Sequence, residues 1–347
     1  MKKYFCQIIV LIVGLVVLVA LAGFFFFQNK NLSDWRWQDV GKNFRETKLV
    51  PRLIDGVLVP EGRDKIFPYA VMIENHFEAR PQSGLNQANL VYEALAEGGI
   101  TRFMAIYASG DEVKEIGSVR SVRPYFLDWV KEFGALLVHH GASFEAWDNI
   151  EKFAVFDLDQ WFDPKYFYLR KDKAVPHNDF TSSTLIEQAL KDKDAPKKGD
   201  FESWLFKEDK EMIFDSQYTV TAETIIIKYP LYAYQVKWVY AQEKNEYQRY
   251  NAGQPHLDSE GKQITAKNIA VERNQAEVVS EEGHLLMGTV GLDEAIVFQD
   301  GIVIKGRWEK KSREGRTRFY GPGGQEVKFN RGTTWVEVVK KETGVEY

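Results

Sequence analysis

The chain has 347 residues, a formal net charge of −5 at pH 7 and a single cysteine. Its lysines and arginines are spread along the chain, which excludes the basic footprint of general nucleic-acid-binding proteins, and we expect no nucleic-acid partner. Hydrophobic residues make up 44% of the chain, enough for a sizeable core. The one cysteine, Cys6, lies near the amino terminus, so the rest of the chain is expected to fold without disulfide bonds or cysteine-bound metal.

The amino-terminal segment, residues 1–28, is predicted to be a transmembrane anchor. Residues 4–27 contain no charged side chain, and about 20 apolar residues are enough for a helix to cross the hydrocarbon core. Lys2 and Lys3 precede this run, which favours an amino terminus in the cytoplasm and the rest of the chain outside. The alternative is a signal peptide cleaved near Ala22, but the apolar run is longer than the hydrophobic region of most signal peptides.

Residues 29–65 are predicted to be a linker that lifts the folded part of the chain off the membrane. The segment is polar and is interrupted by Pro51 and Pro60. Its two tryptophans, Trp35 and Trp37, have the amphipathic rings that favour a membrane surface.

The first folded region, residues 66–198, is predicted to be an α/β domain with a mixed sheet. Short apolar runs indicate buried strands, whereas amphipathic spacing and a proline in the first turn indicate helices. A capping box from Thr184 to Glu187 predicts the start of a further helix, which ends near the charged run at 191–198. The other expected elements are strands at 69–73, 89–95, 102–107 and 135–138, and helices at 123–133 and 144–150.

The second region, residues 199–347, is predicted to be a separate β-rich domain. Asp300-Gly301 predicts a tight hairpin, and residues 321–324 predict another turn. The expected strands lie at 224–229, 234–240, 246–250, 268–271, 295–298, 302–308, 317–320 and 334–339. The predicted fold class is therefore α+β, with a transmembrane helix, an α/β domain and a β-rich domain whose sheet is separate from that of the α/β domain.

Polar residues concentrate between the expected strands of residues 69–141. Strand ends hold side chains rigidly while their tips reach solvent, so polar groups at the ends of buried strands often form a site in α/β folds. Glu74 and His139 each stand at the end of an expected strand. We predict that these two residues perform any acid–base catalysis.

The arginines of the same block are predicted to bind an anionic ligand. Arg120 and Arg123 flank Ser121 just before the helix start at Pro124, where unpaired N–H groups and a partial positive charge favour an anion. The supporting ligand-binding residues predicted from other loops are Arg80, Arg102, Arg170, His177 and Asn178.

An alternative interpretation is that these arginines only fix loops. They would then pair with carboxylates such as Glu74, Glu93 and Glu97. We favour anion binding because Arg120 and Arg123 repel one another unless an anionic group lies between them.

Glu74 and the histidines could also form a metal site. The candidate ligands are Glu74, His76, His139, His140 and His177. None lies in a recognised spacing, such as two histidines four residues apart on a helix with a glutamate between them. Paired histidines after a strand more often give one buried ring and one exposed ring. We therefore assign neither a metal nor a cofactor.

With these motifs in view, the chain resembles the YerB-like family of bacterial envelope lipoproteins, a domain family of unknown function. The similar segments lie at 68–75, 79–84, 91–93, 97–103, 116–125, 176–178, 306–308 and 333–335. The resemblance covers nearly all of residues 66–339 and implies an envelope location and an architecture, but no activity. Family members often carry a lipid-modified cysteine, whereas this chain carries the expected helix.

Two classes of function follow. The first is a membrane-anchored envelope transferase or hydrolase that binds a phosphate- or carboxylate-bearing wall glycan or lipid-linked precursor. Its layout of strands and arginines is loosely similar to that of the LytR-CpsA-Psr phosphotransferases, which is an analogy at the level of the fold. The alternative is a non-catalytic scaffolding or binding module for wall polymers or other envelope proteins.

Overall fold

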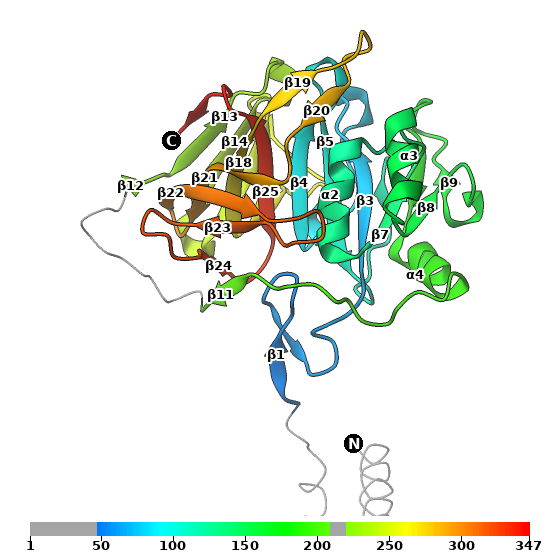
Figure 1. The fold of residues 1–347 in the computed structure, drawn as a ribbon, viewed down its shortest axis with the longest axis horizontal. Coiled ribbons are helices and arrows are strands. Elements are labelled where there is room, and N and C mark those ends of the chain that lie inside the picture. The colour runs from blue at the N-terminus through cyan, green and yellow to red at the C-terminus, as the bar shows by residue number, and fades with distance from the viewer. Residues whose placement is uncertain (1–46, 209–219) are drawn as a thin grey trace, which may run out of the picture. The chain divides into compact units, whose positions relative to one another are not determined.

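The structure, a computed structural model, describes residues 47–208 and 220–347 (Figure 1). The expected anchor at residues 1–28 and residues 29–46 of the expected linker lie outside this part of the chain. Within the described residues, no helix is long and apolar enough to cross a membrane.

A mixed sheet of eleven strands forms the centre of the fold (Figure 1). The sheet is mixed because β3 (Pro68–Glu74) is antiparallel to β5 (Thr101–Ala108) and parallel to β7 (Leu136–His139). In spatial order its strands are β12 (Val220–Thr221), β22 (Ile302–Lys310), β21 (Gly291–Gln299), β18 (Asn268–Asn274), β25 (Thr334–Lys340), β4 (Leu90–Leu95), β5, β3, β7 and β8 (Asp157–Asp159), with β23 (Arg318–Tyr320) beside β22.

Both faces of this sheet are covered, which explains why its central strands are continuously apolar. Along β3, Tyr69 and Val71 face one core, whereas Ala70 and Met72 face the other. The core around Met72 includes residues of α2 (Pro124–Phe133) and α3 (Phe144–Lys152). The opposite core includes α4 (Ser183–Asp192) and a second sheet of six strands. Helices α2 and α3 thus pack on one face of the large sheet, and α4 and the smaller sheet pack on the other.

The remaining elements are short. The six-stranded sheet has the order β16 (Gln254–Pro255), β15 (Glu246–Asn251), β14 (Val236–Ala241), β13 (Thr224–Ile227) and β26 (Val345–Glu346), with β17 (Thr265–Ala266) beside β15. Small sheets are formed by β1 (Leu49–Pro51) with β2 (Leu58–Pro60), by β6 (Ile116–Gly117), β10 (Asp179–Thr181) and β9 (Tyr168–Leu169), by β11 (Leu205–Lys207) with β24 (Lys328–Asn330), and by β19 (Ala276–Val278) with β20 (Leu285–Met287). The 3-10 helices are η2 (Phe77–Ala79), η3 (Leu85–Gln87), η4 (Glu97–Gly99), η5 (Pro164–Tyr166), η6 (Tyr232–Tyr234) and η7 (Gln242–Lys244).

The α+β class with a mixed sheet is confirmed, and the described residues contain three α-helices. Helix α2 covers Pro124–Phe133, within one residue of the predicted 123–133, and Gly134 after it adopts the left-handed conformation that closes the helix. The start predicted for α4 is wrong by two residues. Its first N–H groups are capped by Ser182, whose hydroxyl accepts a hydrogen bond from the Leu185 N–H at 3.3 Å, and not by Thr184.

The prediction of two separate sheets is also wrong. Strand β25, from the second half of the sequence, lies between β18 and β4 and is parallel to both. Thr334 is the partner of Leu90, and Val338 is the partner of Ala94. A strand buried on both faces and paired on both edges joins the two halves into one sheet. Residues Leu49–Tyr347 accordingly form one compact unit.

The described part of the expected linker belongs to the folded body as well. Strands β1 and β2 pair as a hairpin, and Ile54 between them lies in the core. The Arg52 guanidinium donates to both oxygens of Asp55, at 2.9 and 2.6 Å, and Asp55 also accepts from Asn89 at 2.8 Å. This buried, fully hydrogen-bonded pair attaches the hairpin to the residue before β4.

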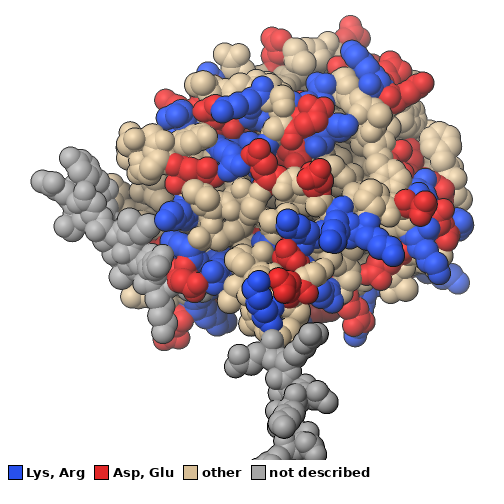
Figure 2. Space-filling view, turned by 60° about the horizontal axis from the view of Figure 1, so that its bottom comes forward, with Lys and Arg blue, Asp and Glu red and all other residues tan. Residues whose placement is uncertain are grey.

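The two ends of the large sheet differ. The hairpin holds the amino end of β4, so the parallel strands β3, β4, β7 and β8 have their carboxyl ends at the opposite end of the sheet. Figure 2 turns the hairpin end forward and shows Lys and Arg interspersed with Asp and Glu there. The residues predicted to form a site gather at the carboxyl end instead.

Candidate functional site

Four neighbouring strands bring polar side chains to the carboxyl end of the sheet. Glu74 ends β3, His139 ends β7 and Asp159 ends β8, while Glu97 follows β4. This is the end at which open α/β sheets usually bind their ligands. The loops that follow these strands carry most of the other predicted site residues.

Glu74 is held by three partners. Its Oε2 atom accepts a hydrogen bond from the Ser118 hydroxyl at 3.0 Å, and it lies 2.9 Å from Arg120 Nε and 3.0 Å from His177 Nδ1. The carboxylate is buried. Glu74 is therefore the counter-ion of Arg120, which is the pairing that the loop-fixing interpretation predicts for this arginine.

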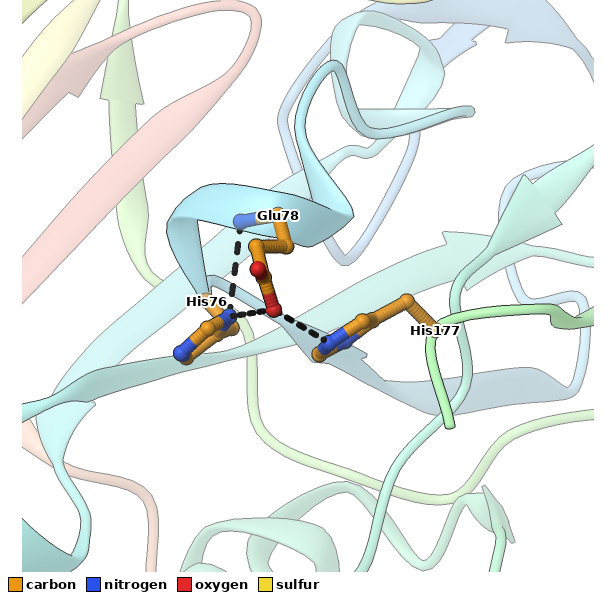
Figure 3. Close-up of side chains that lie close together, drawn as sticks. All are labelled: His76, Glu78 and His177. Atoms are coloured by element: carbon orange, nitrogen blue, oxygen red, sulfur yellow. Dashed lines mark hydrogen bonds and ion pairs between the residues drawn. The ribbon is translucent and has the colours of Figure 1, made fainter. Parts of the chain in front are cut away.

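On its other side, His177 lies beside a further pair of side chains, His76 and Glu78 (Figure 3). His177 Nε2 lies 3.3 Å from Glu78 Oε2, and His76 Nδ1 lies 3.7 Å from the same oxygen. The two imidazole rings are stacked, with centroids 4.9 Å apart and an angle of 7° between their planes. Glu78 was missed in the sequence. The available signal was its position two residues after His76, in the short turn η2 that follows β3.

Arg102, Ser121 and Arg123 form a second cluster around Glu97. Arg123 makes a two-point ion pair with Glu97, as the loop-fixing interpretation predicts. Arg102 instead donates to the carbonyl of Ser121 at 2.6 Å, and its Nε atom is buried without a hydrogen-bond partner in the described residues. Burial and the charge of Arg123 lower the pKa of Arg102 to about 10. The cluster therefore holds two cations and one carboxylate.

Arg80 belongs to neither cluster. Its guanidinium donates to the side-chain and backbone oxygens of Asn75, both at 3.1 Å, and to the carbonyl of Ala233 at 2.9 Å. It also lies over the ring of Tyr234, 5.2 Å from the centroid. Burial and the charge of Arg249 lower the pKa of Arg80 to about 10. Arg80 thus links the loop after β3 to the second sheet.

Arg170 and Asn178, two other predicted ligand-binding residues, lie next to each other and belong to neither cluster. The Arg170 side chain pairs with Glu115 at 2.7 Å and also with Asp172, and its backbone N–H donates to the carbonyl of Asn178 at 2.8 Å. A surface hollow of about 550 Å³ is lined by Arg170 together with Glu78, Pro81, Glu115, Asp172, Lys173, Ala174 and Ser259.

The paired histidines have the predicted division into one buried and one more accessible ring. The fully buried His139 ring lies 2.9 Å from the carbonyl of Gly141 and 3.2 Å from Asp157 Oδ2. His140 is half-buried, and its Nδ1 atom lies 2.9 Å from Asp179 Oδ2. Neither ring contacts Glu74 in the described structure, so the two predicted catalytic residues do not act on one another directly.

Exposed aromatic rings form a surface next to the second cluster, the one around Glu97. We call Phe144, Trp147, Trp161 and Phe162 the aromatic surface. Phe144, Phe162 and Trp161 are 85%, 75% and 59% exposed. Trp147 lies between Phe144 and Trp161, with ring centroids 6.2 and 5.3 Å away. A Cβ atom placed on Gly141 would lie 3.6 Å from the Trp161 ring and 3.8 Å from the Ser121 hydroxyl, so the two groups adjoin.

The fold and the site define an α+β protein with a central mixed sheet and polar residues at the carboxyl end of its parallel strands. Residues 56–196 match the family described as "Protein of unknown function (DUF3048) N-terminal domain", and residues 225–336 match its C-terminal domain. The chain belongs to this family, and the resemblance stated from the sequence is confirmed.

A sequence relative and a solved structure agree with this assignment. The chain is 31% identical over 280 residues to a Bacillus subtilis (strain 168) protein named "Putative lipoprotein YerB", an alignment that covers 78% of this chain and 81% of the relative. The fold is similar to the crystal structure of the YerB protein from Bacillus subtilis, with a TM-score of 0.76 and 28% identity, covering 86% of this chain and 100% of that chain.

Proposed function

We propose that this protein is a membrane-anchored binding module of the cell envelope that holds a glycan bearing a phosphate or carboxylate group. The sugar rings would lie against the aromatic surface, and the anionic group would bind Arg102 and Arg123. The observation that carries this proposal is the surface of exposed aromatic rings beside an arginine that donates to a backbone carbonyl and forms no ion pair with a described carboxylate.

The charge of the second cluster supports an anionic ligand. Glu97 already forms an ion pair with Arg123. Among the described residues, the only hydrogen-bond acceptor of Arg102 is a backbone carbonyl oxygen. A buried donor without a partner is costly, and a charged acceptor offers the strongest compensation. An incoming phosphate or carboxylate would supply that acceptor.

The aromatic surface supports a glycan. Large exposed apolar groups that lie together usually mark an interaction site. Phe144 and Phe162 expose most of their surface, and Trp161 exposes more than half. Flat apolar rings that flank polar groups suit the faces of sugar rings, which are apolar between their hydroxyl groups.

The proposed function is binding without turnover. Glu74 is already bound by Arg120, Ser118 and His177, and the His139 ring is fully buried. A general base must reach the proton that it abstracts. Neither residue has that access in the described structure, so the binding alternative is supported best.

The proposed location is outside the cytoplasmic membrane, with residues 1–28 as a single-pass anchor. The uncharged run at 4–27 and the lysines before it support this topology. The relative named a lipoprotein supports attachment at the envelope. External protease on intact spheroplasts should digest the folded part. Protection of the folded part until lysis would contradict the topology.

Binding can be tested by calorimetric titration of the full-length protein in detergent with wall-glycan fragments and polyprenyl phosphates. Arg102→Ala should weaken binding roughly ten- to a hundredfold, because a charge-assisted hydrogen bond is worth about 1.5–3 kcal/mol. Trp161→Ala should weaken glycan binding roughly two- to tenfold, since a ring contact is worth about 0.5–1.5 kcal/mol.

Leu292→Ala is the matched control, because Leu292 is an exposed apolar residue on β21. It should leave the affinity unchanged. Equal affinities of the wild type, Arg102→Ala and Trp161→Ala would contradict the proposal. Turnover of any of these ligands by the wild type would show that the protein is an enzyme instead.

A further inference from the structure

We propose that His76, Glu78 and His177 bind a divalent transition-metal ion of the zinc class, and that Glu74 orients His177 for this purpose. The proposal does not depend on the glycan site, because it concerns other residues and its test uses the metal alone. The ligand atoms of the three residues all lie within 4.8 Å of one another. Figure 3 shows the Glu78 carboxylate reaching toward both rings.

The first step concerns the proton of His177. A carboxylate only accepts hydrogen bonds, so the contact of 3.0 Å between Glu74 Oε2 and His177 Nδ1 places a proton on Nδ1. In the neutral ring, Nε2 then carries the lone pair. That lone pair faces the Glu78 carboxylate at 3.3 Å, so two acceptors approach each other with no hydrogen between them.

The second step concerns His76. Its Nδ1 atom accepts a long hydrogen bond from the Glu78 N–H at 3.4 Å, which makes Nδ1 the lone-pair nitrogen of this ring as well. The same atom lies 3.7 Å from Glu78 Oε2. Three possible ligand atoms, from two imidazoles and one carboxylate, therefore lie within 4.8 Å of one another. These electron-rich atoms repel one another, and a cation bound between them would remove that repulsion.

The spacing and the donor set point to the type of cation. A tetrahedral zinc ion with bonds of about 2.0–2.2 Å keeps its ligand atoms roughly 3.3–3.5 Å apart. The two pairs that involve Glu78 are close to this spacing, at 3.3 and 3.7 Å, and all three ligand atoms lie within 4.8 Å of one another. Two imidazoles and one carboxylate are a common zinc donor set, whereas Mg²⁺ and Ca²⁺ prefer oxygen alone.

Glu74 supplies the outer support that metal-bound histidines usually have. The second ring nitrogen of such a histidine most often donates to a carboxylate, which fixes the ring and its tautomer. His177 is buried between Glu74 on one side and Glu78 on the other. Glu78 also lines the surface hollow described above, so a fourth position on the metal would open toward solvent.

A proton is the competing cation. A doubly protonated His177 could lie between the carboxylates of Glu74 and Glu78 without any metal. In that case zinc would have to displace a proton from a ring that is already paired on both sides. The two possibilities differ in whether the protein binds zinc stoichiometrically at neutral pH.

The test is calorimetric titration of the full-length protein, stripped with EDTA, dialysed and free of any polyhistidine tag, with ZnCl₂ in detergent. We expect one equivalent of Zn²⁺ to bind and the melting temperature to rise, with no binding heat from MgCl₂. Binding of zinc with no defined stoichiometry, or no binding at all, would overturn the proposal.

Two variants of the ligands locate the site. Glu78→Gln keeps the shape of the side chain, and His76→Ala removes the more exposed of the two rings; each should weaken Zn²⁺ binding at least tenfold while leaving the melting temperature in EDTA unchanged. Glu74→Gln should weaken it roughly ten- to a hundredfold through the loss of the supporting carboxylate.

Matched controls are His284→Ala and Glu277→Gln, which change a histidine and a carboxylate outside the cluster. Both should bind zinc like the wild type. Zinc affinity that is the same in the wild type, Glu78→Gln and His76→Ala would place the metal elsewhere and refute the assignment.

Discussion

Glu132 in α2 and Lys310 at the end of β22 are 178 residues apart in the sequence, yet Lys310 Nζ lies 2.9 Å from Glu132 Oε2 with both side chains fully buried. Arg316 pairs with the other oxygen, and the Thr317 hydroxyl donates to Oε2 at 2.7 Å. Burial alone would raise the pKa of Glu132, but Lys310 and Arg316 lower it to about 2. A helix from the first half of the chain is thereby bound to strands from the second.

Replacing Glu132 with Gln should destabilise the whole protein. The change leaves Lys310 and Arg316 as buried cations without a counter-charge, and breaking a buried ion pair in this way costs about 3–5 kcal/mol. Urea unfolding followed by tryptophan fluorescence should show a single transition at lower urea. Glu151→Gln, on the exposed side of α3, should leave the midpoint nearly unchanged. A two-step transition in the wild type would contradict the view that the halves form one body.

Stability should fall as pH rises because of Glu272. This residue in β18 is fully buried, and burial raises its pKa to about 8. The native state therefore keeps a proton that the unfolded state, with a pKa near 4.3, releases. The contribution to stability is complete below about pH 4.3 and is lost as pH rises toward about 8.

Glu272→Gln removes this titration while keeping the side-chain shape. Between pH 5 and pH 8 the wild type should lose on the order of 3 kcal/mol relative to the variant. Urea unfolding of both proteins at several pH values measures the difference. Parallel pH profiles would show that Glu272 ionises alike in the folded and unfolded states.

Gly306 should not tolerate a side chain. A Cβ atom there would lie 1.7 Å from the Tyr320 carbonyl oxygen, so alanine would force β23 away from β22. We expect Gly306→Ala to cost about 1–3 kcal/mol or more, the range of overpacked sites. Gly288→Ala is the control, because its nearest neighbour would be 3.8 Å away. Equal melting temperatures of the two variants would contradict this account of the close approach between β22 and β23.

Arg120 and Arg102 should respond differently to replacement by alanine. Arg120 is paired with Glu74, so Arg120→Ala should lower the melting temperature and leave the affinity for anionic glycans unchanged. Arg102 is the arginine assigned to the ligand, so Arg102→Ala should lose affinity. If Arg120→Ala abolishes binding while the fold stays intact, the ligand lies at Glu74 and the assignment of the two clusters is wrong.

The local parts of the fold were predictable because their signals are local. The alternating cores of β3 follow from an uninterrupted apolar run, and the start of α2 follows from Pro124. The hairpin of β21 and β22 follows from Asp300 and Gly301, both of which have positive φ angles. The pattern of apolar residues in a strand does not show which other strand pairs with it. The insertion of β25 beside β4 joins residues about 240 positions apart, and no periodicity encodes it.

The candidate site shows the same division. Polar residues at the ends of β3 and β7 indicated which end of the sheet to consider, and Glu74, Arg120 and His177 do lie together. The pairing of Arg120 with Glu74 is the one that the loop-fixing interpretation predicts. The contact of His177 with Glu74 was not predictable, since it depends on how the loop before β10 folds back over β3. Glu78 was missed for the same reason, because its role becomes visible only when His177 approaches from a distant segment.

The position of β25 has a consequence for how the chain folds during synthesis. Strand β4 has no partner on one edge until residues 334–338 have been made, long after β4 itself. An unpaired edge of a buried strand is a template for association with other chains. Folding from the amino terminus onward therefore cannot be completed in stages, and a chain that stops short of β25 should aggregate. Among the described strands only β26 follows β25, so the strand that closes the centre of the molecule is one of the last two to be made.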